Sequence, residues 1–129
     1  MNYFYDVLTP NNTPITSIIT TPIKLTSGTI DYMSIFFPFG CAALVGVQIW
    51  HFGYQLFPTN RTAYYLGDNA LIQFNTIVDV SEEPYTLYIK SYNLDDLYDH
   101  TIYVNVNMTR TIVNNNVVKF IKSLGIGLE

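Results

Sequence analysis

The chain has 129 residues and a mass of 14.7 kDa, a length that favours one domain with its own core over two. Apolar residues make up 49% of the chain, aromatic residues 16% and charged residues only 12%, which excludes a disordered, solvating polypeptide. Ten acidic and six basic residues give a net charge of −4, so we expect no nucleic-acid partner.

Residues 1–14 predict an extended N-terminal arm outside the main domain. Tyr3, Phe4 and Tyr5 are followed by a Pro- and Asn-rich stretch without periodicity, and their aromatic side chains are candidates for contacts with neighbouring subunits. The segment has no basic region, apolar core or small-residue cleavage site. We therefore expect no secretory signal, and we expect the protein to be made in the cytoplasm.

Residues 15–110 consist of short apolar runs separated by Gly, Pro and Asn turns, a pattern typical of an antiparallel β-sandwich. The expected strands are 15–19, 23–25, 29–37, 44–50, 54–57, 70–80, 85–92 and 101–108. Alternation in 29–37 predicts one face made of Ile30, Tyr32, Ser34 and Phe36, and an opposite face made of Asp31, Met33, Ile35 and Phe37. The fold class we predict is all-β, a single sandwich of jelly-roll or Ig-like type with about seven or eight strands.

A membrane span is the alternative for residues 32–60, which contain no Asp, Glu, Lys or Arg and are long enough to cross a bilayer. Gly and Pro residues divide this stretch into pieces of strand length, and no Lys/Arg cluster flanks it. We therefore expect no membrane partner.

Residues 111–129 predict a C-terminal tail with a short amphipathic helix. After the polar run 114–116, the apolar residues Val117, Phe120, Ile121 and Leu124 recur at helical spacing. A helix this short is marginal alone in water, so its apolar face needs a partner. Two alternatives remain: the helix folds back onto its own sandwich, or it docks on a neighbouring subunit.

The densest polar cluster is the acidic loop 93–100, in which Asp95, Asp96 and Asp99 are weak candidates for Ca²⁺ ligands. Asp79, Glu82 and Glu83 would join them if both segments lay at the same end of the sandwich. The loop lacks the fixed Gly and bidentate Glu of an EF-hand, so a solvated loop with local Asp–backbone hydrogen bonds is the main interpretation. His100 either joins such a metal site or bonds to a loop carbonyl or carboxylate.

Residues for catalysis are few, and we predict that the protein is not an enzyme and needs no cofactor. His51 and His100 are the only histidines, and no nucleophile-elbow or Cys–His motif occurs. Cys41 lies in an apolar stretch, which predicts a small buried hydrophobic residue. A carboxylate pair for glycoside chemistry would require residues 82–83 to face residues 95–96 across a cleft.

Tyrosines and the single tryptophan suggest a glycan-binding platform as an alternative function. Aromatic rings can stack on sugar rings, but strand tyrosines also serve cores and interfaces. The residues considered are Trp50, Tyr54, Tyr64, Tyr65, Tyr88, Tyr92 and Tyr98.

Turns and strand edges between residues 28 and 108 resemble those of small β-sandwich proteins encoded among the structural genes of tailed bacterial and archaeal viruses. The segments that carry this resemblance are 37–47, 53–58, 67–68, 84–85 and 92–101. It implies a virion component, a capsid decoration protein or a minor head component, and implies no active-site residue. We expect a homo-oligomer or a subunit bound to the major capsid protein. The alternative is a glycan- or receptor-binding module of a virion or cell surface.

Overall fold

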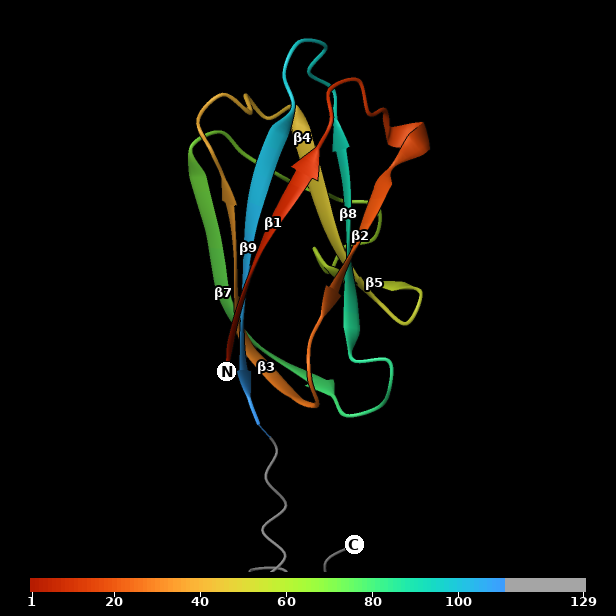
Figure 1. Cartoon of the computed structure of the whole chain (residues 1–129), viewed down its shortest axis with the longest axis vertical. Helices are drawn as coiled ribbons and strands as arrows, with labels where there is room; N and C mark the ends of the chain where they lie inside the picture. Colours follow the sequence, from red (N-terminus) through yellow and green to blue (C-terminus); the bar gives the residue numbers. More distant parts are fainter. Residues whose placement is uncertain (111–129) are drawn as a thin grey trace, which may run out of the picture.

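The computed structural model describes residues 1–110, which form nine strands and one 3-10 turn (Figure 1). The elements in chain order are β1 (Asn2–Thr9), η1 (Ile15–Ser17), β2 (Ile19–Lys24), β3 (Gly28–Phe37), β4 (Val45–His51), β5 (Tyr54–Phe57), β6 (Tyr65–Leu66), β7 (Ala70–Val80), β8 (Thr86–Asn93) and β9 (His100–Thr109). No helix in this part of the chain is long and apolar enough to cross a membrane.

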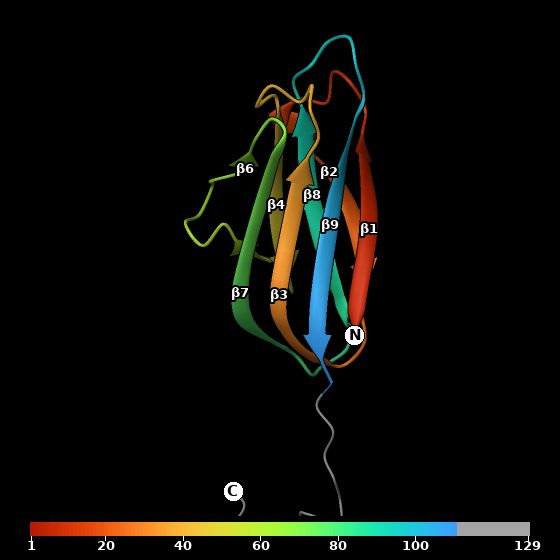
Figure 2. The same cartoon turned by 90° about the vertical axis from the view of Figure 1, so that its left-hand side faces the viewer.

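Two antiparallel sheets pack face to face, which confirms the all-β, sandwich-like architecture (Figures 1 and 2). Sheet A has the strand order β1-β9-β3-β7, and sheet B has the order β2-β8-β4-β5, with β6 also pairing with β4. The chain passes between the sheets at both ends of the sandwich. Loop 94–99 therefore lies at one end, and loop 81–85 lies at the other.

The core between the sheets is built from β-branched and other apolar side chains that alternate along each strand. In β9, Ile102, Val104, Val106 and Met108 all point inward, as their alternation predicts. In β4, Val45, Val47 and Ile49 do the same. Cys41 is completely buried in this cluster, and its burial raises the pKa of the thiol.

A β-bulge in β3 corrects the face assignment made from the sequence. The register of β3 with β7 and with β9 shifts between Ile30 and Tyr32, so Ile30 points into the core, although strict alternation placed it with the outward Tyr32. The side chain of Asp31 accepts hydrogen bonds from Thr109 Oγ1 (2.6 Å) and Asn107 Nδ2 (2.8 Å). These contacts, Thr109 first, lower the pKa of Asp31 and tie the bulge to β9.

The segment expected as an N-terminal arm contributes a strand to sheet A. Asn2–Thr9 pair with Asn107–His100 of β9 along the whole of β1. Tyr3 and Tyr5 pack against the core, whereas Phe4 remains 62% exposed on the outer face. The aromatic start of the chain is thus divided between the core and the surface.

The expected strand 15–19 is instead the 3-10 turn η1, and β2 begins only at Ile19. β2 runs without interruption through Pro22, which pairs with Tyr88. Proline is compatible with this position because β2 is an edge strand of sheet B. The predicted C-terminal helix and its interface residues Val117, Phe120, Ile121 and Leu124 lie outside the described residues.

Candidate functional site

A buried polar cluster joins the two sheets at the end of the sandwich that carries the acidic loop. Asn93, fully buried at the end of β8, donates from Nδ2 to the carbonyls of Thr9 (3.1 Å) and Tyr98 (3.0 Å), and its Oδ1 accepts from the N–H of Asp95 (2.9 Å). Thr9 and Ser91 also share a buried hydroxyl–hydroxyl bond of 2.8 Å between the sheets. These bonds fix the loop on the sandwich.

The acidic loop uses its carboxylates to hold its own backbone and the neighbouring chain. Asp95 Oδ1 accepts from the N–H groups of Leu97 and Tyr98, and its Oδ2 lies 2.8 Å from His100 Nε2. The bond from Leu97, followed by the one from His100, lowers the pKa of Asp95. Asp99 accepts from the N–H of Asn11 (2.8 Å). His100 therefore bonds to a loop carboxylate, one of the two roles considered for it.

Asp95, Asp96 and Asp99 do not form a metal site in the structure. Within residues 1–110, no three His, Cys, Asp or Glu side chains are grouped so that they could hold a metal ion. The other acidic segment, with Asp79, Glu82 and Glu83, lies at the opposite end of β8, a strand of eight residues that spans about 26 Å. The two segments can therefore form neither a shared calcium site nor a catalytic carboxylate pair.

The outer face of sheet A carries an apolar row that crosses all four strands. Tyr103 stacks on Phe4 at a centroid distance of 5.9 Å and on Phe36 at 6.3 Å, and Phe36 pairs with the 52%-exposed Leu71. Together with Ser34 and Asn105, these side chains line a shallow hollow of about 390 Å³. Asn105 Oδ1 is buried there and, among residues 1–110, has no hydrogen-bond partner. The strands of sheet A contain no Lys or Arg.

The row ends at β7, which forms one edge of sheet A (Figure 2). Of the described residues, only those of β3 pair with β7, so one side of an eleven-residue strand offers its backbone N–H and C=O groups. Ile77, 88% exposed, projects from its outer face. We call this edge and the apolar row the assembly face.

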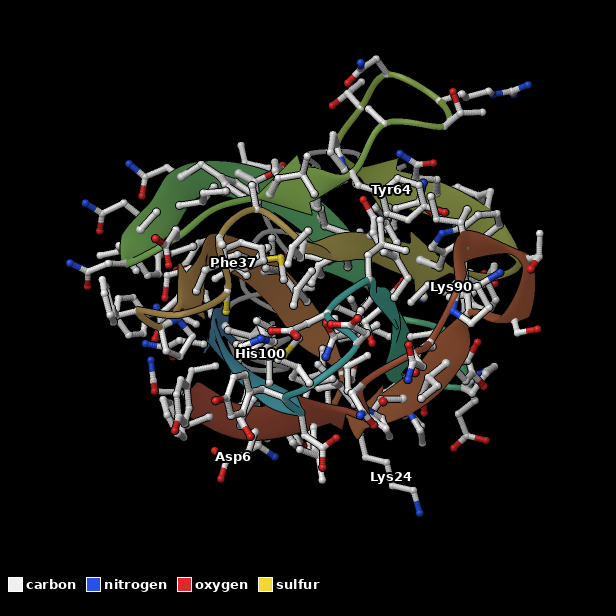
Figure 3. All side chains as sticks on the ribbon, turned by 90° about the horizontal axis from the view of Figure 1, so that it is seen from above. Asp6, Lys24, Phe37, Tyr64, Lys90 and His100 are labelled. Atoms are coloured by element: carbon white, nitrogen blue, oxygen red, sulfur yellow. The ribbon has the colours of Figure 1, made fainter. Side chains whose placement is uncertain are left out.

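The outer face of sheet B contains a groove of about 1000 Å³, larger than the hollow of about 390 Å³ on sheet A. Its lining combines aromatic, amide and cationic side chains and includes no Asp or Glu. The lining residues are Ile15, Ile18, Gln48, Trp50, Gly53, Tyr54, Gln55, Arg61, Thr62, Tyr64 and Lys90. We call it the cationic groove; in Figure 3, Tyr64 and Lys90 lie on this side of the sandwich.

Two glutamines of the sheet hold the wall of the cationic groove. Gln55 Nε2 donates to the carbonyls of Pro58 (2.7 Å) and Asn60 (3.2 Å), and its Oε1 accepts from the N–H of Thr62. Gln48, only 4% exposed, donates to the carbonyl of Ala63 (2.9 Å). The yellow-green loop between β5 and β6, which projects from the sandwich in Figure 3, is thus bonded to the strands beneath it.

The floor of the cationic groove places a cation on an indole ring. Trp50 Nε1 donates to Gln48 Oε1 (2.9 Å), which fixes the ring against the sheet. Lys90 Nζ lies 3.7 Å from the centroid of Trp50, a cation–π contact. Arg61 and Lys90 are 29 residues apart, and the glutamines of the groove belong to no sequence motif. The sequence alone therefore gives no signal for this site.

The structure brings together only part of the tyrosine set considered for glycan binding. Trp50, Tyr54 and Tyr64 line the cationic groove, and Tyr92 supports Tyr64 through an edge-to-face contact of 4.8 Å. Tyr65 instead packs against the core. Tyr98 is 66% exposed on the acidic loop, away from the groove.

His51, at the end of β4, faces a third hollow, of about 420 Å³, which is also lined by Tyr54, Ile77 and Glu82. The ring is 3% exposed, and its Nε2 has no hydrogen-bond partner among the described residues. Burial lowers the pKa of His51, so the imidazole is neutral at neutral pH.

No protein-family model matches the chain, and no curated protein or solved structure is significantly similar to it.

Proposed function

We propose that this protein is a non-enzymatic structural subunit that assembles through protein–protein contacts at the assembly face. The observation that carries the proposal is the edge strand β7. It is eleven residues long and contains no Lys, Arg or Pro, the residues with which soluble sheets usually protect an edge. It also holds the exposed apolar side chains of Leu71 and Ile77.

The partner that best fits this edge is a second copy of the chain. Two β7 strands pairing antiparallel about a twofold axis would satisfy both rows of backbone groups, since such an interface is self-complementary. The pairing would also extend sheet A into one continuous sheet, with the apolar rows of the two copies side by side on the same face. With no Lys or Arg on the strands of sheet A, desolvation of cations does not oppose this contact.

The setting we propose is a virion, with the protein as a capsid decoration or minor head component that also contacts the major capsid protein. The resemblance of residues 28–108 to small structural proteins of tailed viruses supports this setting. The 12% content of charged residues supports it as well, because a surface covered by other subunits needs few charges. A portal or major capsid gene beside the gene for this protein is the expected genomic context.

Light scattering coupled to size-exclusion chromatography tests the assembly. The full chain is expected to elute with a mass above the 14.7 kDa of one copy. Lysine introduced at the edge should disfavour pairing by desolvation, so Leu71→Lys and Ile77→Lys are each expected to raise the dissociation constant at least tenfold.

Leu97→Lys is the matched control, because Leu97 is 72% exposed on the acidic loop and its replacement should leave assembly unchanged. Circular dichroism verifies that all three variants keep the β-sheet fold. A chain that stays monomeric at high concentration and associates with no particle overturns the proposal, as does equal weakening by all three variants.

A further inference from the structure

We propose that the cationic groove of sheet B binds an acidic saccharide, in which carboxylates of uronic or sialic acid residues pair with Arg61 and Lys90. The groove lies on the sheet opposite the assembly face and uses none of its residues. The proposal therefore stands or falls independently of self-assembly.

The charge of the groove is the first argument. Residues 1–110 contain four Lys or Arg side chains against nine acidic ones, yet two of the four cations line the groove and no carboxylate does. Across those 110 residues, the one ion pair is His100–Asp95, so neither Arg61 nor Lys90 is neutralised by a carboxylate of this part of the chain. An anionic ligand would supply the missing partner, and a guanidinium can bind a carboxylate through two parallel hydrogen bonds.

The shape and lining of the groove are the second argument. Its volume of about 1000 Å³ exceeds what a small inorganic ion needs and matches a multi-ring ligand. Tyr54, 53% exposed, and Tyr64 offer ring surface for the C–H faces of sugar rings. Thr62 provides a hydroxyl group for hydrogen bonds to the sugar.

Preorganisation is the third argument. The loop that carries Arg61 is held by Gln55, whose Nε2 donates to backbone carbonyls of the loop and whose Oε1 accepts from the N–H of Thr62, and by one hydrogen bond that Gln48 donates. Thr62 adopts a positive φ of 68°, a backbone conformation that is strained for a β-branched residue. A wall fixed in this way loses little conformational entropy when a ligand binds.

The net charge of the protein favours an acidic saccharide over a nucleic acid as the ligand of the groove. Single-stranded nucleic acid also combines aromatic stacking with cations, but it presents a charge at every phosphate to a protein of net charge −4. A saccharide that carries separated carboxylates meets the two cations without bringing a continuous polyanion against the acidic surface.

Trp50 provides the readout, because it is the only tryptophan in the chain and lines the groove. The full-length protein is titrated with an oligosaccharide in which glucuronic acid alternates with a neutral sugar, with a glucose oligosaccharide of equal length and with a single-stranded DNA oligonucleotide, under selective excitation of tryptophan. The acidic oligosaccharide is expected to change the emission of Trp50 and to bind at least ten times more tightly than either of the others.

Variants of matched charge locate the site. Arg61→Gln is expected to weaken binding of the acidic oligosaccharide about tenfold, whereas Lys24→Gln, which removes an exposed positive charge from β2 outside the groove, should change it less than twofold. Since both side chains are exposed, equal denaturant midpoints are expected for both variants. Absence of binding, equal binding of the glucose oligomer or the DNA, or equal weakening by both variants would overturn the proposal.

Discussion

The two outer faces of the sandwich differ although both are built from antiparallel strands. Sheet A presents a shallow apolar row and no Lys or Arg in its strands, whereas sheet B presents a larger groove with Arg61 and Lys90. The flat face suits another protein surface, which can exclude water over a wide area. The hollow, charged face suits a small anionic ligand that needs orientation by a few polar groups. The two sheets thus share their antiparallel construction, and the distribution of charge and depth distinguishes the two functions proposed for their outer faces.

The largest expected loss of stability comes from breaking the buried hydrogen bonds around Asn93, which join the two sheets. Asn93→Ala leaves the carbonyls of Thr9 and Tyr98 and the N–H of Asp95 without their side-chain partner. Unpaired buried polar groups are costly, so we expect the free energy of unfolding to fall by about 2–4 kcal/mol. Urea denaturation measures this loss.

Asn2→Ala is the control for that experiment, because Asn2 is exposed on β1 outside the apolar row and its replacement should cost less than about 0.5 kcal/mol. If the two alanine variants unfold at the same urea concentration, the cluster around Asn93 does not hold the sheets together. If the Asn93 variant loses much of its free energy of unfolding, both self-association at the assembly face and ligand binding in the cationic groove should become weaker.

Strand alternation predicted much of this fold, but not its interruptions. The inward residues of β9, Ile102 to Met108, follow a clean period of two. The bulge at Asp31 escaped detection because the apolar pattern continues on both sides of it, and the side-chain contacts of Asp31 with β9 join residues far apart in the sequence. β1 was missed as a strand because its outward Phe4 and Leu8 are as apolar as its inward residues, which hides the alternation.

The two surfaces could be predicted from the sequence to different degrees, because residue type indicates an exposed apolar side chain but not a contact between distant segments. Phe4 was selected as an interface residue from its apolar character, and it lies in the hollow of the assembly face. In the cationic groove, by contrast, the decisive contacts join a glutamine of β4 or β5 to backbone groups of the 58–63 loop. Such bonds depend on register and loop path, which residue types alone do not encode.

A smaller loss of stability is expected from a substitution that disturbs only the cationic groove. Gly46 lies beneath the ring of Tyr92, and a Cβ at this position would come within 2.1 Å of that ring. Gly46→Ala must therefore displace Tyr92 and, through it, Tyr64. We expect the free energy of unfolding to fall by about 1–3 kcal/mol and the emission of Trp50 to shift, while self-association at the assembly face persists.

Gly53→Ala provides the comparison for that variant. Gly53 has a φ of 76°, and a Cβ added there would have no atom within 4 Å. The substitution therefore introduces backbone strain without a clash and should cost about 1 kcal/mol. A smaller loss for Gly46→Ala than for Gly53→Ala would contradict the role assigned to Tyr92.

The smallest expected effect is a dependence on pH that arises at His51, which adjoins both surfaces. Its hollow is lined by Tyr54 of the cationic groove and Ile77 of the assembly face, with Asp79 and Glu82 as the other ionisable groups. Burial lowers the pKa of His51 in the folded chain from its ordinary value of 6.5. Below pH 6.5 the unfolded chain therefore binds more protons than the folded one, and stability declines as the pH falls toward the lowered pKa.

Urea denaturation at a series of pH values measures this decline, which for one group cannot exceed about 1.4 kcal/mol per pH unit. His51→Phe retains an aromatic ring beside Phe52 but cannot be protonated, so the pH dependence of stability below pH 6.5 should become shallower. Asp31 and Asp95, whose pKa values are lowered from 3.8, act in a separate window: their stabilisation is lost only as the pH falls below about that value, in both proteins alike. An unchanged slope just below pH 6.5 in the His51→Phe variant would contradict this assignment and would mean that another group makes the stability depend on pH.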